Sequence, residues 1–295
     1  MIKAYIISYL GQGDRAYTRY GQHQQQLNQL LRDERISHIT ILCQAYDVTC
    51  GESRRIEDLC PPHPRITYIH DEQMSPAQAR NKLLKIFYED KEVTWGHFAD
   101  NDAIIDYRYD GTKVYDWFLE DTLPSAVKWV TCMSPRHQPW KGYLQQNEHT
   151  MKDCIPVHQC NYLKTTLFWV KHDTTHIYFD ETMPEMEDMA MIGEVILGGM
   201  LMYQFKSVVM YDMGLHSPVL FTGLQQRNKN MRDWKQYIIE KYKPHGLRYA
   251  IDKNDRMTLN WEAMITQQQP MNIDRSKVLW VPRTKTFGNG LFQTI

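Results

Sequence analysis

The chain has 295 residues, of which 42% are hydrophobic and 23% charged, and its formal net charge at pH 7 is −1. This composition is too apolar for a disordered chain and provides enough hydrophobic side chains for a sizeable core. The N-terminal residues MIKAYIISYLGQGDR contain only a short apolar run, which lacks the length of a membrane-spanning helix and the architecture of a cleavable signal. We therefore predict a folded cytoplasmic protein.

Short runs of β-branched and aromatic residues predict parallel strands in the first half of the chain. They cover Ala4–Tyr9, His38–Gln44 and Arg65–His70, and leucines at helical spacing predict a helix over Arg19–Arg32 between the first two. A fourth strand is predicted over Trp95–Ala99. Strands that alternate with helices are typical of an α/β protein.

The segment SPAQARNKLLKIFYED predicts the most clearly marked helix of the chain. Ser75 is a favoured N-cap residue and Pro76 suits the first helical position, while Ala79, Leu83 and Phe87 belong to an apolar stripe. In the second half, strands are predicted over the ranges 126–133, 162–170 and 205–212. A capping-box pattern predicts that a helix begins at Thr182 and continues to Gly198.

Six cysteines occur without a CxxC pair, and we expect reduced thiols in a cytoplasmic protein. Cys132, Cys154, His158 and Cys160 could together contribute ligands to a zinc site, although their spacing matches no common zinc motif.

Charge is distributed unevenly along the chain. Residues 222–295 carry 13 Lys and Arg against 6 Asp and Glu, a net charge of +7, which leaves −8 on residues 1–221. Such a split favours a C-terminal part that faces a polyanion, or alternatively a solvated lysine-rich surface. We predict a catalytic domain over 1–221, with halves 1–110 and 111–221, and a basic extension over 222–295.

Two aspartates follow the predicted fourth strand in the segment FADNDAII. Asp100 and Asp102 are separated by one residue at the carboxyl end of the strand, the edge at which open α/β sheets bind ligands. Carboxylates so placed could hold a divalent cation that neutralises a leaving diphosphate. A bare D-x-D also arises by chance in the turn that follows a strand.

Several ordered elements together resemble the GT-A glycosyltransferases. They are the strand IISY, an acidic residue after the second strand, the helix SPAQARNKLL, the motif FADNDAII, the segment MPEMEDMAMIGEVILGG and the histidine of MGLHSP. The resemblance implies a mixed, mostly parallel Rossmann-like sheet flanked by helices, with a C-terminal helical or irregular extension. It also implies a nucleotide-sugar donor, expected to be a UDP-sugar, and Mn²⁺ or Mg²⁺.

The same resemblance implies roles for individual residues. Ser8 and Asp47 would bind the donor nucleotide, and Arg80 would approach its diphosphate. The resemblance further implies that Asp100 binds the ribose. It implies that the metal ligands are Asp100, Asp102 and His216. Each residue has a structural alternative, such as an ion pair on the surface of the helix for Arg80 or a loop position for His216.

Glu187 and Asp188 form a second acidic constellation near the start of a predicted helix. In inverting GT-A enzymes a carboxylate at this place accepts the proton of the acceptor hydroxyl, which implies Asp188 as the base and Glu187 as the substitute candidate. Acidic residues in a first turn also stabilise a helix through its dipole. Inversion is preferred here, although a retaining mechanism could use the same metal site.

The acceptor is less closely defined. Soluble GT-A-like chains of this size occur among bacteriophage enzymes that glycosylate hydroxymethylated DNA pyrimidines, so double-stranded DNA in a host cytoplasm is our preferred acceptor. The residues expected to contact its phosphates are Arg227, Lys229, Arg232 and Lys235 around Trp234. A bacterial surface-glycan precursor is the alternative acceptor. A sugar-nucleotide nucleotidyltransferase is the alternative enzyme, although the chain lacks the glycine-rich N-terminal loop expected of one.

Overall fold

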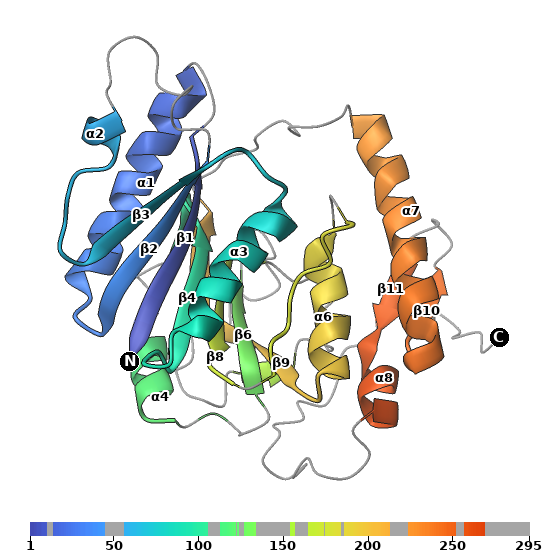
Figure 1. Ribbon diagram of the computed structural model, residues 1–295. Coiled ribbons are helices and arrows are strands. Elements are labelled where there is room, and N and C mark those ends of the chain that lie inside the picture. Colours follow the sequence, from blue (N-terminus) through green and yellow to red (C-terminus); the bar gives the residue numbers. More distant parts are fainter. Residues whose placement is uncertain are drawn as a thin grey trace.

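We describe a computed structural model of the chain (Figure 1). The residues that the structure describes are 1–10, 14–44, 56–105, 113–121, 123, 127–133, 154–156, 165–173, 175–183, 186–212, 224–251 and 257–268. Every statement below about the fold, its cores and its contacts refers to these residues.

Strands and helices alternate through the first half and mix in the second. The strands are β1 (Ile2–Tyr9), β2 (Ile36–Gln44), β3 (Ile66–Asp71), β4 (Trp95–Asp100), β5 (Ala103–Ile105), β6 (Val127–Met133), β7 (Cys154–Pro156), β8 (Leu167–Lys171), β9 (Leu201–Asp212), β10 (Arg248–Ile251) and β11 (Met257–Asn260). The helices are α1 (Asp14–Arg32), α2 (Ile56–Leu59), α3 (Pro76–Glu89), α4 (Lys113–Leu119), α6 (Glu187–Leu197), α7 (Leu224–Tyr242), the 3₁₀ turn η7 (Lys243–His245) and α8 (Trp261–Gln268).

One mixed sheet runs through the molecule in the order β3-β2-β1-β4-β8-β6-β9-β5, with β7 paired to β9. The strands β3, β2, β1 and β4 are parallel, whereas β8 runs antiparallel to both β4 and β6. The predicted α/β class, with a mixed sheet flanked by helices, is confirmed. Among the described helices, none combines the length and the apolar character needed to cross a membrane.

Helices cover both faces of the sheet, and the sheet separates two hydrophobic cores. The core on the α1 side includes Ile6, Leu30, Ile41, Cys43, Val114, Phe118 and Trp169. The core on the α3 side includes Tyr5, Leu83, Phe87, Phe98, Trp129, Met191, Ile196, Ile238, Tyr242 and Trp261. Alternate residues of β1 therefore serve opposite cores, as the pleat of a strand requires.

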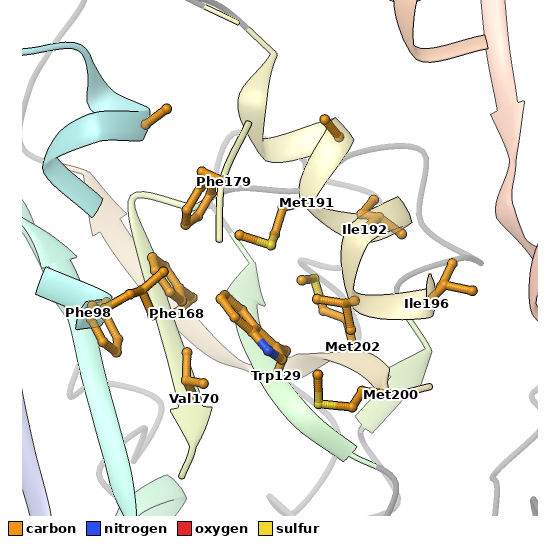
Figure 2. Close-up of a cluster of buried hydrophobic side chains, with 14 of the residues drawn as sticks. Phe98, Trp129, Phe168, Val170, Phe179, Met191, Ile192, Ile196, Met200 and Met202 are labelled. Atoms are coloured by element: carbon orange, nitrogen blue, oxygen red, sulfur yellow. The ribbon is translucent and has the colours of Figure 1, made fainter. Parts of the chain in front are cut away.

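The α3-side core lies between the sheet and α6. Figure 2 shows Met191 of α6 on the side of Trp129 of β6 and Phe168 of β8, whereas Ile196 lies on the far side of the helix. Phe168 stacks between its strand neighbours, with ring centroids 5.0 Å from Phe98 and 5.6 Å from Trp129. This packing fixes α6 over the sheet, and the first turn of α6 carries the predicted catalytic acids.

The C-terminal helices continue the same core. Ile238 and Tyr242 of α7 and Trp261 of α8 are buried against α6, which lies between these helices and the sheet (Figure 1). The Tyr242 hydroxyl donates hydrogen bonds to Glu194 Oε1 at 2.7 Å and to the Ala190 carbonyl at 3.0 Å. Helix α7 is thus attached to α6 by buried apolar and polar contacts. The predicted domain boundary at 221 stays a prediction.

The helix predicted from Thr182 begins later, and that prediction is wrong. Helix α6 starts at Glu187, and its N-cap residue Met186 has a left-handed backbone with φ 62°. The N–H and hydroxyl of Thr182 both donate to Asp180 Oδ1, so Thr182 closes a turn with a preceding residue instead of capping a helix. The helix α3, by contrast, begins as predicted, with a reciprocal capping box between Ser75 and Gln78.

Candidate functional site

Arg80 connects two predicted site residues that lie far apart in the sequence. Its side chain on α3 is 5% exposed, and its Nη1 lies 2.6 Å from Glu187 Oε1. Its Nη2 lies 3.4 Å from both carboxylate oxygens of Asp100, a longer and weaker contact. The arginine is thus a buried bridge between the end of β4 and the start of α6.

Asp100 is the last residue of β4, which lies beside β1 in the parallel part of the sheet. It is paired in register with Ile7, which packs against the α3-side core. The Asp100 side chain therefore lies on the α3 face of the sheet, where it contacts Arg80. The D-x-D pair occupies a tight turn because Asn101 and Asp102 connect β4 directly to β5.

Two glutamines of α1 hold this turn from the opposite side of the sheet. The Gln26 side-chain amide donates to the carbonyls of Asp100 and Ala103, each at 2.6 Å. Gln29 donates to the Ile105 carbonyl at 2.6 Å and accepts from the Ile105 N–H at 3.0 Å. Gln26 is 1% exposed. Buried amides thus fix the backbone on both sides of Asp102.

Glu187 and Asp188 occupy the first turn of α6, after the left-handed residue Met186. A methionine in this conformation is strained, because its Cβ approaches the backbone in a way that glycine avoids. Asp188 Oδ1 accepts a hydrogen bond from the N–H of Met189 at 2.8 Å. The left-handed residue precedes the first turn of α6, in which Glu187 meets Arg80.

The site contains more negative than positive charge among its described residues. The Arg80 guanidinium is surrounded by the carboxylates of Asp100, Glu187 and Asp188. Burial, together with the nearby charge of Glu187, raises the pKa of Asp188 to about 7, while Arg80 opposes this rise. A carboxyl group of this kind binds and releases a proton near neutral pH.

The chemistry of this site fits a hard divalent cation. Carboxylate oxygens are the ligands that Mg²⁺ and Mn²⁺ prefer, and Asp100 and Asp102 offer them at the two ends of one turn. The surplus of negative charge around Arg80 also attracts a cation electrostatically. His216, the third predicted ligand, lies outside the described residues.

Other predicted donor-binding residues are placed differently. Ser8 is fully buried and follows Ile6 by two positions on β1, so it faces the α1-side core, away from Arg80. Asp47 lies outside the described residues. The donor-binding roles of Ser8 and Asp47 stay predictions.

The predicted nucleic-acid contacts all lie on α7. Arg227 and Lys229 belong to its first half, Arg232 is exposed and Lys235 is half-buried. Trp234 packs against the α3-side core and meets Tyr237 edge-to-face at 6.0 Å between ring centroids. The indole thus contributes to the attachment of α7 to the protein.

Sequence reasoning missed Gln26, Gln29 and Met186. A polar glutamine run is typical of a solvent-exposed helix face, and only the three-dimensional position of the D-x-D turn reveals that Gln26 is buried.

Comparisons with known proteins find likeness in structure alone. No protein-family model matches the chain, and no curated protein sequence matches it. A crystal structure of S. aureus TarS 1-349 in complex with UDP-GlcNAc is similar with a TM-score of 0.48 at 12% identity, over 81% of this chain and 66% of that chain. A further S. aureus TarS structure gives a TM-score of 0.47 at 10% identity, over 83% and 44% respectively.

The chain spans less than two thirds of the length of these TarS structures. The function proposed below therefore rests on the geometry of the site.

Proposed function

We propose that the protein is a glycosyltransferase that moves a sugar from a nucleotide-sugar donor, expected to be a UDP-sugar, to an acceptor hydroxyl. The observation that carries this proposal is the buried bridge that Arg80 forms with Glu187 and with Asp100 at the carboxyl edge of the sheet. Asp188 follows Glu187 in the first turn of α6, and its raised pKa, about 7, supports the assignment. A base with a pKa near the working pH transfers protons most efficiently. This edge is also where open α/β sheets bind nucleotides.

In the proposed reaction, Asp188 accepts the proton of the acceptor hydroxyl while that oxygen attacks the anomeric carbon. The bond between the anomeric carbon and the diphosphate breaks, and the nucleoside diphosphate leaves with the electron pair. Direct attack of this kind inverts the anomeric configuration. Arg80 keeps Glu187 and Asp100 in place.

Asp100 and Asp102, together with His216, are the residues that would hold a divalent cation. Such a cation supplies positive charge to the leaving diphosphate. The buried amide of Gln26 gives the two aspartates a fixed backbone, so the carboxylates are positioned before a ligand arrives.

Replacement of Asp188 by Asn tests the proposed base. The expected loss of transfer rate is on the order of 10²–10⁴-fold, with donor binding retained, because only proton transfer is removed. Nucleotide sugars, with and without Mn²⁺, are assayed by thermal shift for binding, and released nucleotide is assayed for turnover. An Asp188→Asn protein that transfers sugar at the original rate would contradict the assignment.

The replacement Asp102→Ala tests the metal site separately. We expect it to abolish the dependence of donor binding on Mn²⁺ and to suppress donor hydrolysis. An active Asp102→Ala protein with unchanged metal dependence would rule out the D-x-D turn as the cation site, whatever the result for Asp188.

For the acceptor, we propose hydroxymethylated pyrimidines in double-stranded DNA. The net charge of +7 on residues 222–295 and the exposed Arg232 on α7 support an anionic polymer as substrate. Binding to duplex DNA is expected to weaken steeply with salt. A gel-shift titration at two salt concentrations measures this, with a double variant Arg232→Glu and Lys235→Glu as the comparison. The absence of binding at low salt would contradict a DNA acceptor.

A further inference from the structure

Three side chains with metal-binding atoms converge on the α1 face of the sheet. They are Cys43 on β2, Cys60 just after α2 and His70 on β3, and one ligand atom of each lies within 4.8 Å of the others. The two sulfur atoms are 4.0 Å apart. Among the described residues this group of three is a separate constellation from the carboxylates around Arg80.

Two of the three ligands come from neighbouring strands in register. Cys43 is paired with His70 in the parallel ladder between β2 and β3, so both side chains project from the same face of the sheet. Cys43 is buried and His70 is exposed at the sheet edge. The two strands thus set the distance between this sulfur and this imidazole without help from a loop.

The segment that bears Cys60 is held by hydrogen bonds from two tyrosines. Tyr20 of α1 donates to the Asp58 carbonyl at 3.3 Å, and Tyr68 of β3 donates to the Pro61 carbonyl at 3.1 Å. These bonds bracket Cys60 on both sides. The third ligand is therefore positioned against the strands by contacts that do not involve its own sulfur.

The spacing of the two sulfurs agrees with that of a shared zinc ion. Two thiolates bound to one tetrahedral Zn²⁺ at about 2.3 Å stand about 3.8 Å apart, close to the distance found here. Two thiolates and one imidazole form a donor set typical of zinc and poorly suited to Mg²⁺ or Mn²⁺. The arrangement needs only a small movement to close around a zinc ion.

We propose that Cys43, Cys60 and His70 bind a zinc ion that fastens the end of α2 to the edge strand of the sheet. The three ligands fill three positions of a tetrahedral ion, and the exposure of His70 leaves the fourth open to water. Edge strands are the weakest part of a sheet, and a metal that links β2, β3 and α2 stabilises this edge.

The zinc site and the proposed donor site are independent. Cys43 belongs to the α1-side core, whereas Arg80 and Asp100 meet on the α3 face of the same sheet. The proposal therefore does not rest on the proposed sugar transfer, and either could fail without the other.

Metal analysis of the full chain, purified without chelator and with reduced thiols, tests the proposal. We expect stoichiometric zinc, its loss on treatment with a strong chelator, and a rise in apparent melting temperature when ZnCl₂ is returned. Co²⁺ in place of zinc is expected to give the near-ultraviolet charge-transfer absorption of a thiolate ligand. Mn²⁺ is expected to give neither effect at this site.

Variants separate this site from other cysteines. His70→Ala alters an exposed side chain and is expected to keep the fold while zinc affinity falls at least tenfold. Cys60→Ala is expected to lose zinc, whereas Cys132→Ala, at a buried cysteine of β6, is expected to keep it. Equal zinc in all three variants would overturn the proposal. So would a metal-free chain, whether Cys43 and Cys60 are reduced or joined as a disulfide.

Discussion

Arg80 and Glu187 are separated by 107 residues and meet at 2.6 Å in a buried ion pair. This single contact joins α3 to the first turn of α6, and the same guanidinium reaches Asp100 at the end of β4. The geometry of the acidic site is thus set by one cation that serves two carboxylates.

Glu187→Gln is expected to lower the pKa of Asp188 and to shift the acidic limb of the pH–rate profile to lower pH. Burial and the negative charge of Glu187 together raise the pKa of Asp188 to about 7, so a neutral amide removes the second contribution. Since the ionised form of Asp188 is the proposed base, activity in the wild type rises with pH through this value. The profile of kcat/KM against pH measures the shift.

Glu194→Gln on the same helix is the matched control, because Glu194 contacts Tyr242 and Lys241 at the far end of α6. We expect its pH profile to coincide with that of the wild type. Identical profiles for Glu187→Gln and the wild type would contradict the role of Asp188.

Arg80→Met is expected to destabilise the fold by about 3–5 kcal/mol, because it leaves buried carboxylates without their partner. Lys171→Met removes an ion pair with Asp121, whose side chain is 65% exposed, and is expected to cost about 0–1 kcal/mol. Urea unfolding followed by circular dichroism compares the two. Equal losses would mean that the Arg80 cluster is far better solvated than its burial indicates.

Gln26→Met is expected to lower the free energy of unfolding by about 1–3 kcal/mol, since two buried carbonyls lose their donor. Donor and Mn²⁺ affinity are expected to fall as well, because the backbone around Asp102 is no longer fixed. Gln25→Met, at the exposed neighbouring position, is expected to change stability by about 0.5 kcal/mol or less. Unchanged metal affinity in the Gln26 variant would mean that cation binding does not depend on this turn.

Gly193→Ala is expected to destabilise the contact between α6 and α7. A Cβ at this position would lie 2.5 Å from two ring carbons of Tyr242, so the ring must move, at a cost of about 1–3 kcal/mol. Gly21→Ala in α1 meets nothing within 4 Å and is expected to stabilise the protein by about 0.5–1 kcal/mol. Thermal melts of the two variants should therefore shift in opposite directions.

Local signals in the sequence predicted the parts of the fold that local physics determines. Strands β1 and β2 were found because their runs of β-branched and apolar residues fill mostly buried strands, and α3 because Ser75 and Pro76 mark its start. The convergence of Arg80, Asp100 and the Glu187–Asp188 pair also followed from motifs, but only through their family resemblance. Spacing alone does not bring residues 107 positions apart into contact.

The remaining features depend on tertiary context. The start of α6 was misplaced because a capping-box pattern at Thr182 competes with the partner that Asp180 provides nearby. Likewise, Cys43, Cys60 and His70 show no recognisable spacing, since their proximity arises from strand register and from the position of α2. Such distances are set by the pairing of strands, and the register of that pairing cannot be read from a single sequence.

The docking of α7 on α6 also orders events during synthesis on the ribosome. The Tyr242 hydroxyl is bonded to Glu194, 48 residues earlier, so α6 emerges from the exit tunnel long before its outer cover. Until Tyr242 and Trp261 follow, the apolar surface of α6 that they bury stays open to water and to other nascent chains. The helix that carries Asp188 therefore gains its full burial only after residue 261 has been synthesised.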